Sequence, residues 1–120
     1  MNYVDSHILE QVWGDWNRYK RKKDYEELCM MIYKICDGVS KKFYPRDKEE
    51  HEELTNQAFY MVLNKMNRGV LKYTPGKASV FNLLTTAIYN LLYSYKTKQR
   101  NEVNRIKKYA FKRYNIKIGE

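Results

Sequence analysis

The sequence predicts an all-α protein, a compact bundle of about four to five helices. Apolar side chains recur every three or four positions throughout the chain, and the alternation typical of strands is almost absent. Only two prolines and five glycines interrupt the 120 residues. A chain of this length builds one domain around a single core. We expect that helical domain over residues 1–103 and a basic extension over residues 104–120.

The first two helices are predicted over residues 5–23 and 24–43. Asp5 or Ser6 can cap the first helix through a side-chain oxygen. Its apolar stripe comprises Ile8, Val12, Trp13 and Trp16. The second helix carries apolar residues three or four positions apart, namely Leu28, Ile32, Ile35, Cys36, Val39 and Phe43. It should end at Tyr44-Pro45, because the residue before a proline is disfavoured in helical conformation.

Two further helices are expected in the second half of the chain. Asp47 can cap the third helix, which should end at Asn67-Arg68-Gly69. Its buried face would consist of Leu54, Ala58, Met61, Val62 and Met66. A turn at Tyr73-Thr74-Pro75-Gly76 then precedes a fourth helix that begins near Ala78.

The fourth helix has two distinct sides. The inward side carries Phe81, Leu84, Ile88, Leu91, Leu92 and Tyr95. The opposite side is polar, aromatic and basic, with Asn82, Thr86, Tyr89, Asn90, Tyr93, Lys96 and Arg100. From about Val103 the apolar pattern weakens, and the helix is expected to continue into a basic tail.

Charge is unevenly distributed along the chain. Lys and Arg number 23 against 14 acidic residues, a formal net charge of +9. Residues 94–120 hold nine Lys or Arg and two Glu, whereas residues 47–53 hold five acidic residues, one Lys and one His. This segregation favours a polyanionic partner, chiefly nucleic acid, over a role in solubility alone. If the protein has two partners, they should differ in the sign of their charge.

Several function classes lack sequence support. There is no glycine-rich phosphate loop, no metal-binding His-Glu spacing and no nucleophile elbow, so we expect neither catalysis nor a cofactor. No apolar run is long enough to span a bilayer and no signal peptide is evident, which favours the cytoplasm and argues against a membrane partner. Cys29 and Cys36, on one helical face, are interpreted as buried small hydrophobes and not as zinc ligands.

The outer face of the third helix is a candidate protein-binding surface. It combines carboxylate, amide and phenol groups from Glu53, Asn56, Gln57, Tyr60 and Asn64. Such a mixture suits a partner protein better than DNA. An ordinary solvated face is the alternative interpretation.

Residues 53–100, an amphipathic helix, a turn and an increasingly basic helix, resemble the conserved second region of bacterial sigma factors. Glu53-Leu54-Thr55-Asn56-Gln57 occupies the place of the family's Asp-Leu-Ile-Gln-Glu stretch, with Gln57 replacing the second acid. The stretch from Tyr73-Thr74-Pro75 to Phe81 is similar to the family's Phe-Asp-Pro segment followed by a small residue, Ser or Thr and an aromatic residue. In that family the first helix docks on a coiled coil of core RNA polymerase, and the second holds the promoter −10 element.

The layout over about residues 3–103 is most similar to the late-transcription sigma factors of tailed phages related to the T-even group. The last five residues are not the clamp-binding motif with which those factors end, and no region for a −35 element is present. The resemblance implies polymerase contacts at Glu53, Asn56, Gln57, Tyr60 and Asn64. It implies DNA contacts at Lys77, Phe81, Asn82, Thr86, Tyr89, Asn90, Tyr93, Lys96, Lys98 and Arg100.

The partners implied are therefore the coiled coil of core RNA polymerase and a −10-like element with its non-template strand, with a coactivator or sliding clamp left open. Lys and Arg can hold phosphates, while Tyr89 and Tyr93 can stack on unpaired bases. Two alternatives remain: a generic helical nucleic-acid-binding module, and an adaptor that binds polymerase without recognising a promoter.

Overall fold

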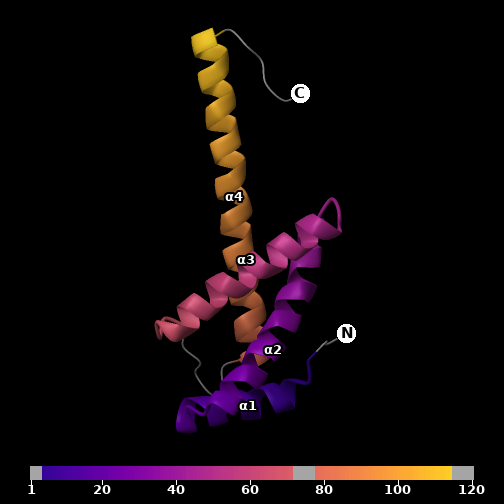
Figure 1. Ribbon diagram of the computed structural model, residues 1–120, viewed down its shortest axis with the longest axis vertical. Helices are drawn as coiled ribbons and strands as arrows, with labels where there is room; N and C mark the ends of the chain where they lie inside the picture. The colour runs from indigo at the N-terminus through magenta and orange to yellow at the C-terminus, as the bar shows by residue number, and fades with distance from the viewer. Residues whose placement is uncertain (1–3, 72–77, 115–120) are drawn as a thin grey trace.

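The computed structural model describes residues 4–71 and 78–114, and in these ranges it contains helices and no strand (Figure 1). The order is α1 (Ser6–Tyr19), α2 (Lys22–Ser40), the short 3₁₀ helix η1 (Lys41–Phe43), α3 (Lys48–Asn67) and α4 (Val80–Tyr114). Helices α2 and α4 each contact the other three α-helices. The prediction of an all-α bundle is confirmed.

The predicted capping residues begin two of the helices. The Asp5 carboxylate accepts hydrogen bonds from the backbone N–H groups of His7 and Ile8, at 2.9 and 3.2 Å. Asp47 accepts from the N–H of Glu50 at 2.8 Å. Such caps satisfy backbone donors that the first turn of a helix leaves without partners.

Helix α1 ends earlier than predicted, at Tyr19 and not near residue 23. Lys20 adopts a left-handed conformation with φ 54°, and its N–H donates to the carbonyl of Trp16 at 2.9 Å. The turn places the Lys20 amine 3.9 Å from the centre of a Trp16 ring, where a cation is attracted to the aromatic face. The predicted single run through the basic segment was therefore wrong.

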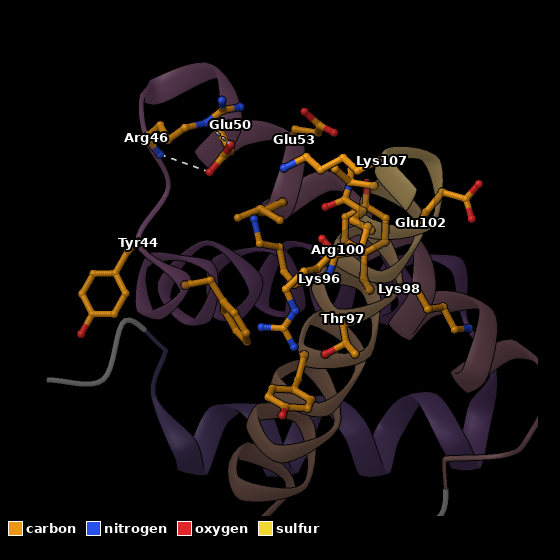
Figure 2. Close-up of a pocket in the computed structure, with 17 residues that line it drawn as sticks. Tyr44, Arg46, Glu50, Glu53, Lys96, Thr97, Lys98, Arg100, Glu102 and Lys107 are labelled. Carbon is orange, nitrogen blue, oxygen red and sulfur yellow. Dashed lines mark hydrogen bonds and ion pairs between the residues drawn. The ribbon is translucent and has the colours of Figure 1, made fainter. Parts of the chain in front are cut away.

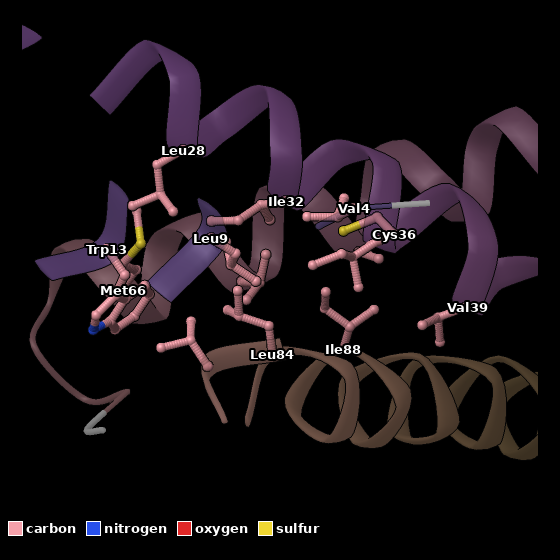
Figure 3. Close-up of a cluster of buried hydrophobic side chains, with 14 of the residues drawn as sticks. Val4, Leu9, Trp13, Leu28, Ile32, Cys36, Val39, Met66, Leu84 and Ile88 are labelled. Atoms are coloured by element: carbon pink, nitrogen blue, oxygen red, sulfur yellow. The ribbon is translucent and has the colours of Figure 1, made fainter. Parts of the chain in front are cut away.

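The core is formed by apolar side chains from all four α-helices (Figure 3). Its fully buried members include Leu9, Leu28, Ile32, Ile35, Cys36, Ala58, Val62, Val80, Leu84, Ile88 and Leu92. The predicted inward residues of the second, third and fourth helices are buried or half-buried. In α1 the prediction of Ile8 was wrong, because Ile8 is 48% exposed and its neighbour Leu9 is fully buried.

A buried polar contact joins α2 to α3. The hydroxyl oxygens of Ser40 and Thr55 lie 2.8 Å apart in the core. Thr55 also donates to the backbone carbonyl of His51 at 2.8 Å. Buried hydroxyl groups need such partners, so this pair favours one register of the two helices over others.

The two cysteines are free thiols with different surroundings. Cys36 is fully buried, as predicted, and burial raises the pKa of its thiol to about 12. Cys29 is only half-buried, which corrects the prediction for that residue; burial also raises its thiol pKa, with a hydrogen bond involving Tyr25 opposing the shift. Neither thiol is activated as a nucleophile, since reactive cysteines have lowered pKa values.

The start of α4 is held by a residue from α1. The Glu10 carboxylate accepts a hydrogen bond of 2.7 Å from the backbone N–H of Val80, 70 positions along the chain. Ser79 supplies a second, local cap through its hydroxyl, which accepts from the N–H of Asn82 at 3.0 Å. Glu10 therefore fixes the position at which α4 begins against α1.

We expect Glu10→Ala to lower the free energy of unfolding by about 1 kcal/mol, because a helix N-terminus loses a charged acceptor. Glu10→Gln keeps an acceptor oxygen and should lose less. Urea denaturation of the two variants and the wild type measures the effect. Equal stability of all three proteins would show that this contact contributes nothing.

Helix α4 extends well beyond the other helices (Figure 1). The molecule measures 60 × 27 × 27 Å, and Val103 and Ile106 are exposed on the projecting part of α4. The helix runs without a break through residue 103, where we predicted the basic extension to begin. Among the described residues, no helix is both long and apolar enough to cross a membrane.

Candidate nucleic-acid and polymerase interfaces

An open groove lies between the α2–α3 connection and the second half of α4 (Figure 2). Phe43, Tyr44 and Arg46 line it on the connection side. Residues of α4 from Tyr93 onward line it on the other side, and the first turns of α3 contribute Glu50 and Glu53. The groove thus brings together the acidic and the basic segments that the sequence analysis assigned to different partners.

The predicted phosphate-binding residues occupy two sides of α4. Lys96 and Arg100 are four positions apart, so they share one face. Lys98 is two positions from each, and residues at that spacing do not face the same way. Figure 2 shows the Lys98 side chain pointing to another side of α4 than Lys96 and Arg100, although all three residues line the groove.

Two acidic residues of the groove are already engaged. Glu50 forms an ion pair of 2.7 Å with Arg46, and this hydrogen-bonded guanidinium lowers the pKa of the Glu50 carboxyl. Glu53 lies beside Tyr95 of α4; burial, followed by the charge and hydrogen bonding of Glu53, raises the pKa of the Tyr95 phenol. Glu53, predicted to contact polymerase, therefore also contacts α4.

The other predicted polymerase residues lie along the exposed side of α3. Asn56, Tyr60 and Asn64 are exposed and Gln57 is half-buried. The Asn56 side chain accepts a hydrogen bond from the phenol of Tyr33 on α2 at 3.1 Å. The Tyr33 ring also meets Phe59 edge-on, with centroids 5.3 Å apart, so an aromatic pair adjoins this surface. The sequence analysis missed that pair, because it depends on contact between α2 and α3.

The outer side of α4 is as polar and aromatic as predicted. Asn82, Thr86 and Asn90 are exposed on it, and Tyr93 is 58% exposed. Tyr89 is 43% exposed but packs on Phe43, with ring centroids 5.1 Å apart at an interplanar angle of 38°. Of the two predicted stacking residues, Tyr93 is therefore the more accessible.

Two of the predicted DNA contacts, Phe81 and Lys77, are not shown to be accessible. Phe81 is half-buried and packs against the core, so its ring has limited access to a ligand. Lys77 and the turn over residues 73–76 lie outside the described residues.

Two aromatic groove residues were missed as binding candidates. The sequence analysis placed Phe43 in the core and used Tyr44 only as a helix terminator. Both follow two lysines in the segment KKFYPR, where adjacent aromatic and basic residues are the signal that could have identified them.

We expect Lys96→Ala and Arg100→Ala each to reduce the slope of log affinity against log salt, for a single-stranded oligonucleotide, by about 0.7. The reason is that each phosphate contact releases condensed counterions. Lys34→Ala removes the same charge from the exposed side of α2, outside the residues that line the groove, and is the matched control. Equal slopes for all three variants would show that the phosphates of the oligonucleotide do not contact the side of α4 that carries Lys96 and Arg100.

Together these surfaces offer cations for phosphates, aromatic rings for unpaired bases, and a polar face on α3 for a protein partner. Comparisons of this chain with protein-family models, with curated proteins and with solved structures find no match. The functional argument therefore rests on the residues themselves.

Proposed function

We propose that this protein is a sigma-like specificity factor, which binds core RNA polymerase and holds open a −10-like promoter element. The observation that carries the proposal is the outer side of α4. Exposed Tyr89 and Tyr93 are followed within two turns by Lys96 and Arg100 on the same helix. Rings that can stack on bases beside cations that can hold phosphates are typical of proteins that bind single-stranded nucleic acid.

The mechanism proposed is capture of an opened strand. The basic half of α4 attracts the promoter, with seven Lys or Arg against one Glu between residues 96 and 112. Tyr93 stacks on a base that has left the duplex, and Asn82 and Asn90 offer amide groups to base edges. Binding free energy then offsets the cost of unpairing, without nucleotide hydrolysis.

Docking on polymerase is assigned to the outer side of α3. Tyr60 is 69% exposed near the middle of this surface, between Gln57 and Asn64. Tyrosine is enriched among the residues that dominate binding energy at protein interfaces. The partner proposed is the coiled coil of the largest polymerase subunit, and the motivation is the likeness of residues 53–57 to the sigma-family stretch.

We further propose that the protein is a phage-encoded factor for late transcription, and that it acts in the cytoplasm of the host. It rests on the layout of residues 3–103 alone. A coactivator or a sliding clamp as an additional partner remains open.

In vitro transcription tests the proposal directly. Core polymerase is incubated with promoter-bearing phage DNA, with and without this protein, and the start sites are mapped. Defined starts that depend on the protein are the expected result. Binding to oligonucleotides without affinity for core polymerase would indicate a generic nucleic-acid-binding module. Binding to core polymerase without affinity for a single-stranded −10-like oligonucleotide would indicate an adaptor.

A further inference from the structure

Tyr44 is the most exposed of the large hydrophobic side chains, at 89%, in the part of the chain that the structure describes. It follows η1 and adopts a left-handed conformation with φ 52° and ψ 60°. L-residues other than glycine, asparagine and aspartate rarely adopt this conformation. Residues held in rare backbone conformations cluster at functional sites. The conformation and exposure of Tyr44 therefore indicate a role in binding.

The rings of Phe43 and Tyr44, which are adjacent in sequence, have different surroundings. The ring of Phe43 packs on Tyr89 of α4, with centroids 5.1 Å apart. The ring of Tyr44 extends into solvent at the edge of the groove that Lys96 and Arg100 also line. Aromatic side chains therefore line both sides of this basic groove, Tyr44 and Phe43 on the connection side and Tyr93 on the α4 side.

The charges of the groove favour an anionic ligand. The carboxylates of Glu50 and Glu102 are engaged by Arg46 and Arg105, at 2.7 and 2.6 Å. The remaining acid of the groove, Glu53, lies against the Tyr95 phenol.

On the α4 side of the groove, Lys96 and Arg100 form no ion pair among the described residues. The charge of Lys96 is the last of the causes that lower the pKa of the Glu50 carboxyl, after the contacts of Arg46. Both cations therefore remain available to phosphates.

We propose that this groove binds single-stranded nucleic acid, with Tyr44 as a platform on which one base stacks and with Lys96 and Arg100 on the phosphates. The inference rests on the proposed function, because it extends the path of the strand from Tyr93 across the groove. A paired duplex has no free base face to offer Tyr44. The site therefore selects for an opened strand, and a purely acidic peptide would not use the ring.

The test uses a fluorescently labelled mixed-sequence single strand of about 12 nucleotides, within the range of single-strand-binding sites. Tyr44→Gly removes the ring and suits the left-handed backbone, so it should preserve the fold. Tyr44→Phe keeps the ring. Tyr19→Ala is the matched control, an exposed tyrosine at the end of α1 outside the groove.

By fluorescence anisotropy, Tyr44→Gly should weaken single-strand binding about fivefold, the lower end of the effect of losing one stacked base. Tyr44→Phe and Tyr19→Ala should bind within about twofold of wild type, and duplex affinity should not change in any variant. A strand carrying 5-iodouracil should cross-link to Tyr44, as identified by mass spectrometry of the peptides.

Each opposing result has a distinct meaning. Wild-type affinity in Tyr44→Gly, with weakened binding in Tyr93→Ala, would overturn the role of Tyr44 and leave the proposed function standing. An absence of single-strand binding by the wild-type protein would overturn both. If polyglutamate competes as well as the oligonucleotide and Tyr44→Gly has no effect, the groove is a site for acidic peptides and the stacking assignment is wrong.

Discussion

Tyr60→Ala should weaken the binding of core RNA polymerase about 30-fold, because truncating a tyrosine at the centre of an interface costs about 2 kcal/mol or more. Tyr60 is 69% exposed on α3 and no packing supports it, so its loss should change the free energy of unfolding by about 0.5 kcal/mol or less. Surface-immobilised core polymerase titrated with the variant measures the affinity. Thermal unfolding of the same samples tests whether the fold is intact.

Tyr19→Ala is the matched control for this experiment. Tyr19 is also an exposed tyrosine, but it lies at the end of α1, away from the predicted docking surface. Unchanged polymerase affinity in Tyr60→Ala would refute docking through the outer side of α3. Charge reversal at Glu53 is a less specific test, because Glu53 also contacts Tyr95 on α4.

Tyr93→Ala should weaken binding to a single-stranded −10-like oligonucleotide about tenfold or more, since a stacked base contributes about 1–3 kcal/mol. Tyr93→Phe should have a mild effect, because the ring is retained. Opening of a duplex promoter should fall in parallel, while duplex binding before opening should change little. Permanganate footprinting of the promoter complex with core polymerase reports the opening.

Tyr89→Ala must be interpreted differently from Tyr93→Ala. Tyr89 packs on Phe43, so its removal also loosens the contact between η1 and α4. Urea denaturation separates the two effects, because only Tyr89→Ala should lower stability. Normal promoter melting in Tyr93→Ala would show that the exposed tyrosine of α4 does not hold the strand.

Much of the fold follows from local sequence. The caps at Asp5 and Asp47 depend on side chains within three positions of the N–H groups that they satisfy. The buried residues of α3 and α4 recur at the helical period, so the pattern alone identified Val62, Leu84 and Ile88. These features were predictable because each depends on neighbours within about one turn of helix.

The candidate site was only partly predictable, because it combines residues of one helix with contacts between separate elements. The spacing in α4 identified Tyr93 and Lys96 as outward residues, and both line the groove. The spacing could not show that Tyr89 packs on Phe43. That packing depends on contact between elements that are distant in sequence.

By itself, the sequence determined the helical class, the capped starts of α1 and α3, and which side of α4 faces outward. Tertiary structure decided that Leu9 and not Ile8 enters the core, and that Glu10 caps α4 across 70 positions. It also decided that Tyr44 lines the same groove as Lys96 and Arg100. The physical reason is the distance along the sequence between the interacting residues. Helix periodicity and caps depend on residues a few positions apart, whereas a groove forms only when separate helices pack together.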